Sequence, residues 1–377
     1  MCLFLTGGKN MKKKNNNNPK LLIIVEAFAS GIYTYLKGLL NGIVDDYDIT
    51  VLYALRSQTP KNFEKDFDKR IKFIQSKHLT RSIGLHDFKA LSEIRKLVKE
   101  IQPDIIHCHS SKVGALTRVG VNTKKYKVFY TPHGYSFLMQ DSSKIKRALY
   151  WIFEKVGAMN HATTIACSKG EYEASLSLTK RATYISNGVN LDDIKEYIPK
   201  TIKKIDLKNI TIVTTGRISY QKNPKLFNQI AEAFPDIKFI WVGEGDLESE
   251  LTSNNIEVTG WKTKDELMDI VNKSDIFILT SLWEGLPLSL LEAMALKKPC
   301  IVSNVIGNKD VIENEVNGFV CNNLEDFIET IQNIQNNKYD LKEISSNTYQ
   351  SILDIYNTKI MSDNYKKLYQ ELSGSSM

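Results

Sequence analysis

Short apolar runs alternate with longer amphipathic stretches through most of the chain. Each run is five or six residues long and rich in Val, Ile, Phe and Tyr, as in LLIIV at residues 21–25 and IKFIWV at residues 237–242. Such runs between helical stretches are typical of strands that a parallel sheet buries on both faces. The pattern predicts strands at residues 21–25, 49–53, 71–75, 104–108, 127–131 and 162–166 in the first half, and at 210–215, 237–242, 256–260, 275–279, 299–303 and 318–322 in the second. We therefore expect an α/β protein with two parallel sheets, each covered by helices on both faces.

A polar segment separates the two series of strands. IPKTIKKIDLKN, residues 198–209, has no clear core pattern, and 377 residues are enough for two domains of ordinary size. The polar run KKKNNNNPK follows Met11, which is an alternative start, and it indicates an unstructured leader. The expected organisation is a leader over residues 1–18, an N-terminal domain over 19–195, a C-terminal domain over 206–350 and a C-terminal helix over 351–377, of which 351–372 has a helical pattern.

Two carboxylates stand eight positions apart in SLWEGLPLSLLEAMA, residues 281–295. Glu284 lies in a loop after a predicted strand, and Glu292 lies among apolar residues in the helix that follows. A carboxylate in such surroundings needs partners, which ribose hydroxyls would supply, because burying it unpaired is costly. Pro287 fits the first position of the helix, and the free N–H groups of Leu286, Leu288 and Ser289 should then attract phosphate. A helix-start acid and an unrelated loop acid are the alternative interpretation.

Two cations follow the strand predicted at residues 210–215. Gly216 lets the backbone turn sharply at the end of that strand. Arg217 and Lys222 then share one loop before a helix that begins near Pro224. A guanidinium can grip two oxygens and an ammonium adds a point charge, so the two side chains suit a diphosphate. The alternative is that both are solvated surface cations.

Both clusters belong to a longer series of motifs. In chain order the series is TPHGYSF (131–137), ISNGVNLDDI (185–194), TTGRISYQKNP (214–224), WVGEGDLESEL (241–251), VTGWKTKDEL (258–267) and WEGLPLSLLEA (283–293). It resembles family 4 of the retaining glycosyltransferases, which have the GT-B architecture of two Rossmann-like domains with parallel sheets facing an interdomain cleft. The first loop departs from the paired glycines of that family. It is Ala29-Ser30-Gly31, in which only Gly31 can be carried over.

The resemblance implies a role for each candidate residue. Glu292 would bind the ribose of a nucleotide sugar, and Glu284 would hold hydroxyls of the donor sugar. Arg217 and Lys222 would neutralise the departing diphosphate, and His133 would position the donor sugar against the acceptor. Further donor-binding positions would be Gly31, Gly216, Gly285, Leu286, Pro287, Leu288 and Ser289. Transfer would keep the anomeric configuration without a protein nucleophile, metal or other cofactor, and a terminal helix would return to the first domain.

Three other segments superficially suggest a metal. Asp46-Tyr47-Asp48 and Asp66-Phe67-Asp68 each spell D-x-D, but the first lies in a polar turn and the second in a charged run. His107-Cys108-His109 ends a predicted strand, where neighbouring side chains point to opposite faces, and no further ligand is evident. We therefore expect no metal site.

Composition is typical of a soluble globular protein, with 42% hydrophobic and 25% charged residues. No apolar run is long enough to cross a bilayer, and MCLFLTGGKN at the start has too short an apolar core for a secretion signal. Five widely scattered cysteines fit a reducing compartment. We therefore expect a cytoplasmic protein.

Charge is divided unevenly between the two halves. Residues 1–200 hold 32 Lys and Arg against 18 Asp and Glu, a net +14, whereas residues 201–377 hold 18 against 25, a net −7. The first half should therefore meet something anionic. KIKRALYWIFEK, residues 144–155, combines basic and aromatic residues as a membrane-interface helix does, although a core helix with a basic face would also fit. Without a nucleic-acid motif, we expect a membrane surface and no nucleic acid.

These observations lead to one preferred function and two alternatives. We expect a hexosyltransferase that uses a UDP-sugar and a lipid-linked or oligosaccharide acceptor at the inner face of the cell membrane, in the synthesis of a capsule, O-antigen or similar bacterial polysaccharide. The alternatives are an NDP-sugar epimerase of the same architecture and a non-catalytic nucleotide-sugar-binding subunit. The base, the sugar, the acceptor and the linkage stay open at this point.

Overall fold

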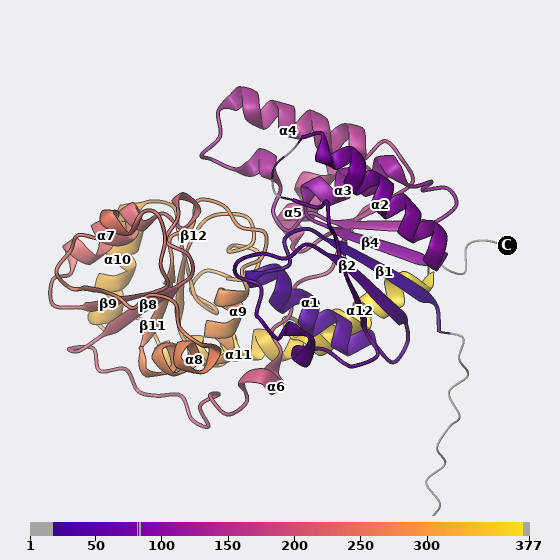
Figure 1. The fold of residues 1–377 in the computed structure, drawn as a ribbon. Helices are drawn as coiled ribbons and strands as arrows, with labels where there is room; N and C mark the ends of the chain where they lie inside the picture. The colour runs from indigo at the N-terminus through magenta and orange to yellow at the C-terminus, as the bar shows by residue number, and fades with distance from the viewer. Residues whose placement is uncertain (1–17, 81, 83, 372–377) are drawn as a thin grey trace, which may run out of the picture.

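The apolar runs form the strands of two parallel sheets, one in each half of the chain (Figure 1). The structure is a computed structural model that describes residues 18–80, 82 and 84–371. All but residue 18 of the expected leader lies outside the described residues. The two predicted sheets and their α/β class are confirmed.

The first sheet has seven strands in the order β3-β2-β1-β4-β5-β6-β7. They are β1 (Lys20–Val25), β2 (Asp48–Tyr53), β3 (Lys72–Gln75), β4 (Ile105–His109), β5 (Lys127–Thr131), β6 (Thr163–Ala166) and β7 (Ala182–Tyr184). The sequence pattern missed β7, because this edge strand of sequence ATY is only half-buried and has no apolar run. Central β1 pairs in parallel with β2 and β4, so Ile23 lies opposite both Val51 and His107.

Helices cover both faces of the first sheet (Figure 1). Leu21, Ile23 and Val25 of β1 pack with α1 (Ser30–Ile43) and α12 (Thr358–Glu371). Leu22 and Ile24 point the other way, as the period of two along a strand requires. The helices on that side are α2 (His86–Ile101), α3 (Ser111–Gly120), α4 (Lys144–Gly157) and α5 (Lys169–Leu176).

The second sheet has six strands in the order β10-β9-β8-β11-β12-β13. They are β8 (Thr211–Thr215), β9 (Lys238–Val242), β10 (Ile256–Val258), β11 (Ile276–Leu279), β12 (Cys300–Ser303) and β13 (Phe319–Cys321). Its helices are α7 (Pro224–Ala233) and α10 (Leu324–Gln335) on one face, with α8 (Lys264–Lys273) and α9 (Leu288–Ala295) on the other. Short helices in the connections are α6 (Leu191–Ile194), η1 (Phe63–Asp66), η2 (Ser136–Leu138), η3 (Tyr220–Lys222) and η4 (Glu248–Glu250).

The end of the described chain returns to the first sheet. Helix α11 (Leu341–Asp354) packs on α9, and α12 packs on α1. Asn357 separates α11 from α12, because its amide donates to Ile352 O and Leu353 O while its carbonyl oxygen accepts from Ile360 N. The segment therefore contains a break between two helices, and α12 carries the chain back across the first sheet.

The carboxyl ends of both sheets face each other. The loops after β1 and β5 meet the loops after β8 and β11, which is where parallel α/β sheets bind ligands. The two halves touch at Gly285, where a Cβ atom would lie 3.0 Å from both Gly134 N and Cys167 Sγ. Asn187 Nδ2 also donates to Leu286 O at 2.9 Å. A glycine at position 285 therefore permits a close approach between the halves.

Candidate active site

A cleft of about 1120 Å³ lies between the two sheets. The first half contributes the loop after β1, Tyr35 of α1 and His133 after β5. The second half contributes the loops after β8 and β11 and the start of α9. All of the candidate residues line it: Gly31, His133, Gly216, Arg217, Lys222, Glu284, Gly285, Leu286, Pro287, Leu288, Ser289 and Glu292. The fold therefore gathers residues that lie up to 261 positions apart in the chain.

Lys222 and Glu284 form an ion pair in the cleft. Lys222 Nζ lies 2.7 Å from Glu284 Oε1, and the side chains are 17% and 8% exposed. Gln221 supports the pair, because its Nε2 donates to Trp283 O at 2.9 Å. Thr280 Oγ1 donates to Lys222 O at 2.8 Å and fixes the lysine backbone. The ammonium and the carboxylate are thus held together by the loops that follow β8 and β11.

Glu292 has the partner that its surroundings require. It lies in α9 with only 9% of the residue exposed, and Lys264 Nζ of α8 contacts its Oε1. Lys264 was not among the residues expected from the sequence, although it follows Thr263, the N-cap of a capping box with Glu266 that starts α8. Because Lys264 also lines the cleft, the second carboxylate and its cation face the same space as the first pair.

Arg217 lies at the exposed rim of the cleft. Its Nη2 is 2.8 Å from Asp246 Oδ2, and the two side chains are 48% and 86% exposed. Ion pairs this exposed contribute roughly 0–1 kcal/mol, so an anionic ligand can displace Asp246 at little cost. Gly216 precedes the arginine with a φ of +134°, which only glycine adopts readily.

The start of α9 presents backbone donors to the cleft. The helix begins at Leu288 with Pro287 as its N-cap, so Pro287 does not occupy the first helical position that the sequence predicted. The displacement is one residue, and Pro287 has the extended ψ of 122° that an N-cap requires. The N–H groups of Leu286, Leu288 and Ser289 have no acceptor among the residues that the structure describes. They remain free to bind an anion.

The first loop makes its turn at Ser30, one residue before Gly31. The left-handed conformation falls on Ser30, with a φ of +49°, while Gly31 lies in the first turn of α1. A Cβ atom at Gly31 would meet nothing within 4 Å. The open space beside Gly31 leaves room for a ligand at the start of α1.

His133 is a neutral side chain facing the cleft. It has a φ of +56°, and burial lowers its pKa to about 3. Its Nε2 lies 3.1 Å from His109 Nδ1, whereas His109 Nε2 is buried without a hydrogen-bond partner among the described residues. A buried unpaired acceptor is tolerated better than an unpaired N–H. We therefore assign the shared proton to His109 Nδ1, which leaves His133 with its proton on Nδ1.

His107, in the His-Cys-His segment, has a structural role. His107 Nδ1 lies 2.7 Å from Tyr369 Oη and its Nε2 lies 2.8 Å from Thr131 Oγ1, so both ring nitrogens are occupied. Burial holds the pKa of His107 well below its usual range. Within residues 18–80, 82 and 84–371 there is no group of three or more side chains placed to hold a metal ion.

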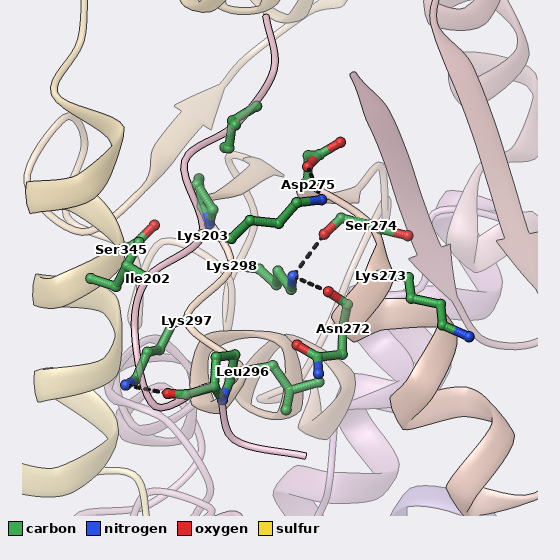
Figure 2. Close-up of a pocket in the computed structure, with 13 residues that line it drawn as sticks. Ile202, Lys203, Asn272, Lys273, Ser274, Asp275, Leu296, Lys297, Lys298 and Ser345 are labelled. Carbon is green, nitrogen blue, oxygen red and sulfur yellow. Dashed lines mark hydrogen bonds and ion pairs between the residues drawn. The ribbon is translucent and has the colours of Figure 1, made fainter. Parts of the chain in front are cut away.

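A cavity of about 370 Å³ lies at the opposite edge of the second sheet (Figure 2). It adjoins the amino ends of β11 and β12, whereas the cleft adjoins the carboxyl ends. Lys298 Nζ donates there to Asn272 O at 2.6 Å and to Ser274 O at 2.7 Å, and burial lowers the pKa of Lys298 to about 8. Lys203 pairs with Asp275 at 3.1 Å beside it. These contacts satisfy carbonyls at the end of α8, which indicates a structural role.

Each half of the chain matches the profile of a known protein family. The profile of a family described as Glycosyltransferase Family 4 matches residues 29–193, and that of Glycosyl transferases group 1 matches residues 198–351. The chain is 32% identical, over 78% of its length and 82% of the relative, to the UDP-Gal:alpha-D-GlcNAc-diphosphoundecaprenol alpha-1,3-galactosyltransferase of Escherichia coli. It is 26% identical to the E. coli O-antigen biosynthesis glycosyltransferase WbnH, over 64% of this chain and 70% of that one.

Solved structures share the fold. Sucrose-phosphate synthase from Thermosynechococcus elongatus superposes with a TM-score of 0.79 at 16% identity, over 96% of this chain and all of that one. Anabaena HepE in complex with UDP superposes with a TM-score of 0.74 at 15% identity, over 93% of this chain and all of that one. At these identities the likeness shows the fold alone.

Proposed function

The chain belongs to glycosyltransferase family 4 and is a glycosyltransferase of the GT-B fold, and on that premise we propose that it transfers a hexose from a UDP-sugar with retention of the anomeric configuration. One observation carries this proposal: two lysine–glutamate pairs, an arginine and the free N–H groups at the start of α9 all face one cleft. The two lysines and the arginine suit the negative charge of a diphosphate. The two carboxylates suit the hydroxyls of the donor sugar and of the ribose.

The donor would lie across the second half of the cleft. Glu292, held by Lys264, would accept hydrogen bonds from the ribose hydroxyls, and Glu284 would accept them from the donor sugar. The diphosphate would then reach Lys222, Arg217 and the start of α9. Lys222 is already positioned by Glu284 at 2.7 Å, so it needs little reorganisation when negative charge develops.

The reaction exchanges one bond at the anomeric carbon. The acceptor hydroxyl attacks from the side on which the diphosphate departs, the bond from carbon to phosphate oxygen breaks, and the acceptor proton passes to that oxygen. Lys222 and Arg217 stabilise the diphosphate that leaves, and His133 orients the sugar through the proton on Nδ1. We expect no metal requirement, because the cations of the cleft supply the charge.

We further propose a lipid-linked saccharide as the acceptor, presented at the cytoplasmic membrane face during assembly of a bacterial surface polysaccharide. The E. coli relative whose name specifies UDP-Gal and a diphosphoundecaprenol acceptor supports this, and so does the net +14 of residues 1–200. UDP-galactose is accordingly the first donor to test. No helix in the described part of the chain combines the length and the hydropathy of a membrane span.

Transfer is tested with the purified protein, UDP-galactose and a diphosphoundecaprenol-linked N-acetylglucosamine acceptor. We expect UDP release that depends on the acceptor and a product with an α linkage by NMR. Inversion at the anomeric carbon would contradict the mechanism. Interconversion of the nucleotide sugar without acceptor would identify an epimerase instead, and binding of UDP without any turnover across donors and acceptors would identify a binding subunit.

A further inference from the structure

Helix α4 (Lys144–Gly157) is turned with its apolar side toward solvent. Five apolar residues, four in the helix and one just after it, are 52–80% exposed. They are Ile145, Leu149, Ile152, Val156 and Met159. The spacing of four, three, four and three residues keeps them on one face. A core helix would turn its apolar side toward the sheet. The interpretation of residues 144–155 as a core helix is therefore wrong.

The buried side of α4 is held by charge and hydrogen bonds. Glu154 is 1% exposed, its Oε2 lies 2.8 Å from Arg118 Nη2, and its Oε1 accepts from Tyr130 Oη at 2.8 Å. Arg118 also lies over the Tyr130 ring at 3.9 Å. A buried ion pair of this kind needs a fixed geometry. It therefore fixes the rotation of α4 and keeps the apolar stripe outward.

Basic residues border the exposed stripe. Lys144 and Lys146 are exposed and, at 100° per residue, lie on either side of Ile145. His161 N donates to Thr123 Oγ1 at 3.2 Å, which brings the loop with exposed Lys124 and Lys125 beside the end of α4. The only acid of the helix is the buried Glu154. The outward surface of α4 is thus apolar in the middle and positive at both ends.

We propose that α4 is the element that docks the protein onto an anionic phospholipid membrane, lying in the plane of the interface. Apolar side chains flanked by lysines are the pattern of interfacial helices, whose binding combines apolar burial with attraction to anionic lipids. A second copy of the chain fits this surface less well, because a symmetric contact would bring like charges of two α4 helices together. Figure 1 places α4 on the outer side of the first sheet, at the top of the view.

The docking surface is independent of the catalytic cleft, although its use in catalysis rests on the proposed lipid-linked acceptor. The cleft lies at the carboxyl ends of the strands, and no residue of α4 lines it. Membrane binding and sugar transfer can therefore be measured separately, and a failure of one leaves the other interpretable.

The test is cosedimentation of the full-length protein with vesicles of phosphatidylglycerol and phosphatidylcholine, without substrates. We expect binding at low salt and little binding to phosphatidylcholine alone. The double variant Leu149→Glu and Ile152→Glu should weaken partitioning more than about tenfold. Replacing Lys144 and Lys146 with Gln should weaken it by about fivefold for each lysine, an effect that high salt removes.

The control is the double variant Val316→Glu and Leu353→Glu, which adds the same two charges at apolar residues of the second half that are 44% and 39% exposed. It should bind vesicles as the wild type does, and all variants should keep their thermal unfolding midpoint and their activity on a water-soluble acceptor. The proposal is overturned if the wild-type protein does not bind anionic vesicles or if the Leu149 and Ile152 variant binds them equally. A dimer in solution that this variant dissociates would also overturn it, because the stripe would then be a contact between copies.

Discussion

Replacing Lys222 with alanine removes the ammonium that contacts Glu284 and that we assign to the departing diphosphate. Removing one preorganised donor to developing charge lowers turnover by about 10²- to 10³-fold, or roughly 3–4 kcal/mol. The lysine side chain is only 17% exposed, so water replaces it poorly. We therefore expect a loss of that size in kcat, with a smaller change in KM, because the charge is greatest in the transition state.

The same change also affects stability, and its size follows from burial. Breaking a fully buried ion pair is destabilising by about 3–5 kcal/mol, whereas an exposed pair contributes at most about 1 kcal/mol. Glu284 is 8% exposed but faces an open cleft, so we expect a loss of about 1–3 kcal/mol, the range between these limits. Removing Glu284 as well should recover part of that stability and none of the activity.

Steady-state kinetics and chemical denaturation of three variants separate these effects. They are Lys222→Ala, the double variant Lys222→Ala with Glu284→Ala, and Lys225→Ala as a matched control on the exposed side of α7. The control should resemble the wild-type protein in both measurements. Near wild-type turnover in folded Lys222→Ala would refute the role of this lysine, and recovery of turnover in the double variant would show that the lysine only neutralises Glu284.

Three further outcomes follow from the structure. Gly285→Ala should lower kcat/KM by at least about tenfold in kinetic assays. Its Cβ atom would lie 3.0 Å from both Cys167 Sγ and Gly134 N of the first half, which would disturb the contact between the halves. Unchanged kinetics would show that this contact is dispensable. Lys264→Ala should weaken UDP binding in calorimetry by leaving Glu292 unpaired, whereas Lys273→Ala at the exposed far end of α8 should bind UDP as the wild type does; equal affinity of the two variants would show that Lys264 is dispensable. As the pH falls from about 6.5 to 3, His133 should lower the free energy of unfolding by about 1.4 kcal/mol per pH unit, because the unfolded chain binds a proton there that the folded protein does not. Burial also lowers the pKa values of His107 and His109, which add slopes of the same sign. His133→Gln should therefore reduce the measured slope by the share of one histidine, and an unchanged slope would place the titration elsewhere.

The sheets were predictable because their strands are nearly uniform apolar runs. LLIIV must be buried on both faces, and only a parallel sheet between helix layers allows that. The pattern failed at β7, where an edge strand has few buried contacts, and at the turn of α11 into α12. There a single side chain, Asn357, caps both helices, and its hydrogen bonds depend on the fold rather than on periodicity.

The site was predictable in its residues and less so in its pairings. Strand ends placed Arg217, Lys222 and Glu284 at one sheet edge, and the family motifs identified them. The contact between Lys264 and Glu292 spans two helices and has no sequence spacing that would reveal it. For α4 the sequence left two interpretations open, an interfacial helix and a core helix, because an amphipathic pattern does not specify which face is buried when a buried ion pair overrides it.

A crystal structure of the protein with UDP tests the central claim most directly. We predict the diphosphate within hydrogen-bond distance of Lys222, Arg217 and the N–H groups of Leu288 and Ser289, with the ribose hydroxyls on Glu292. Diphosphate bound outside the cleft, or bound in it while Lys222 and the start of α9 face only solvent, would contradict the account.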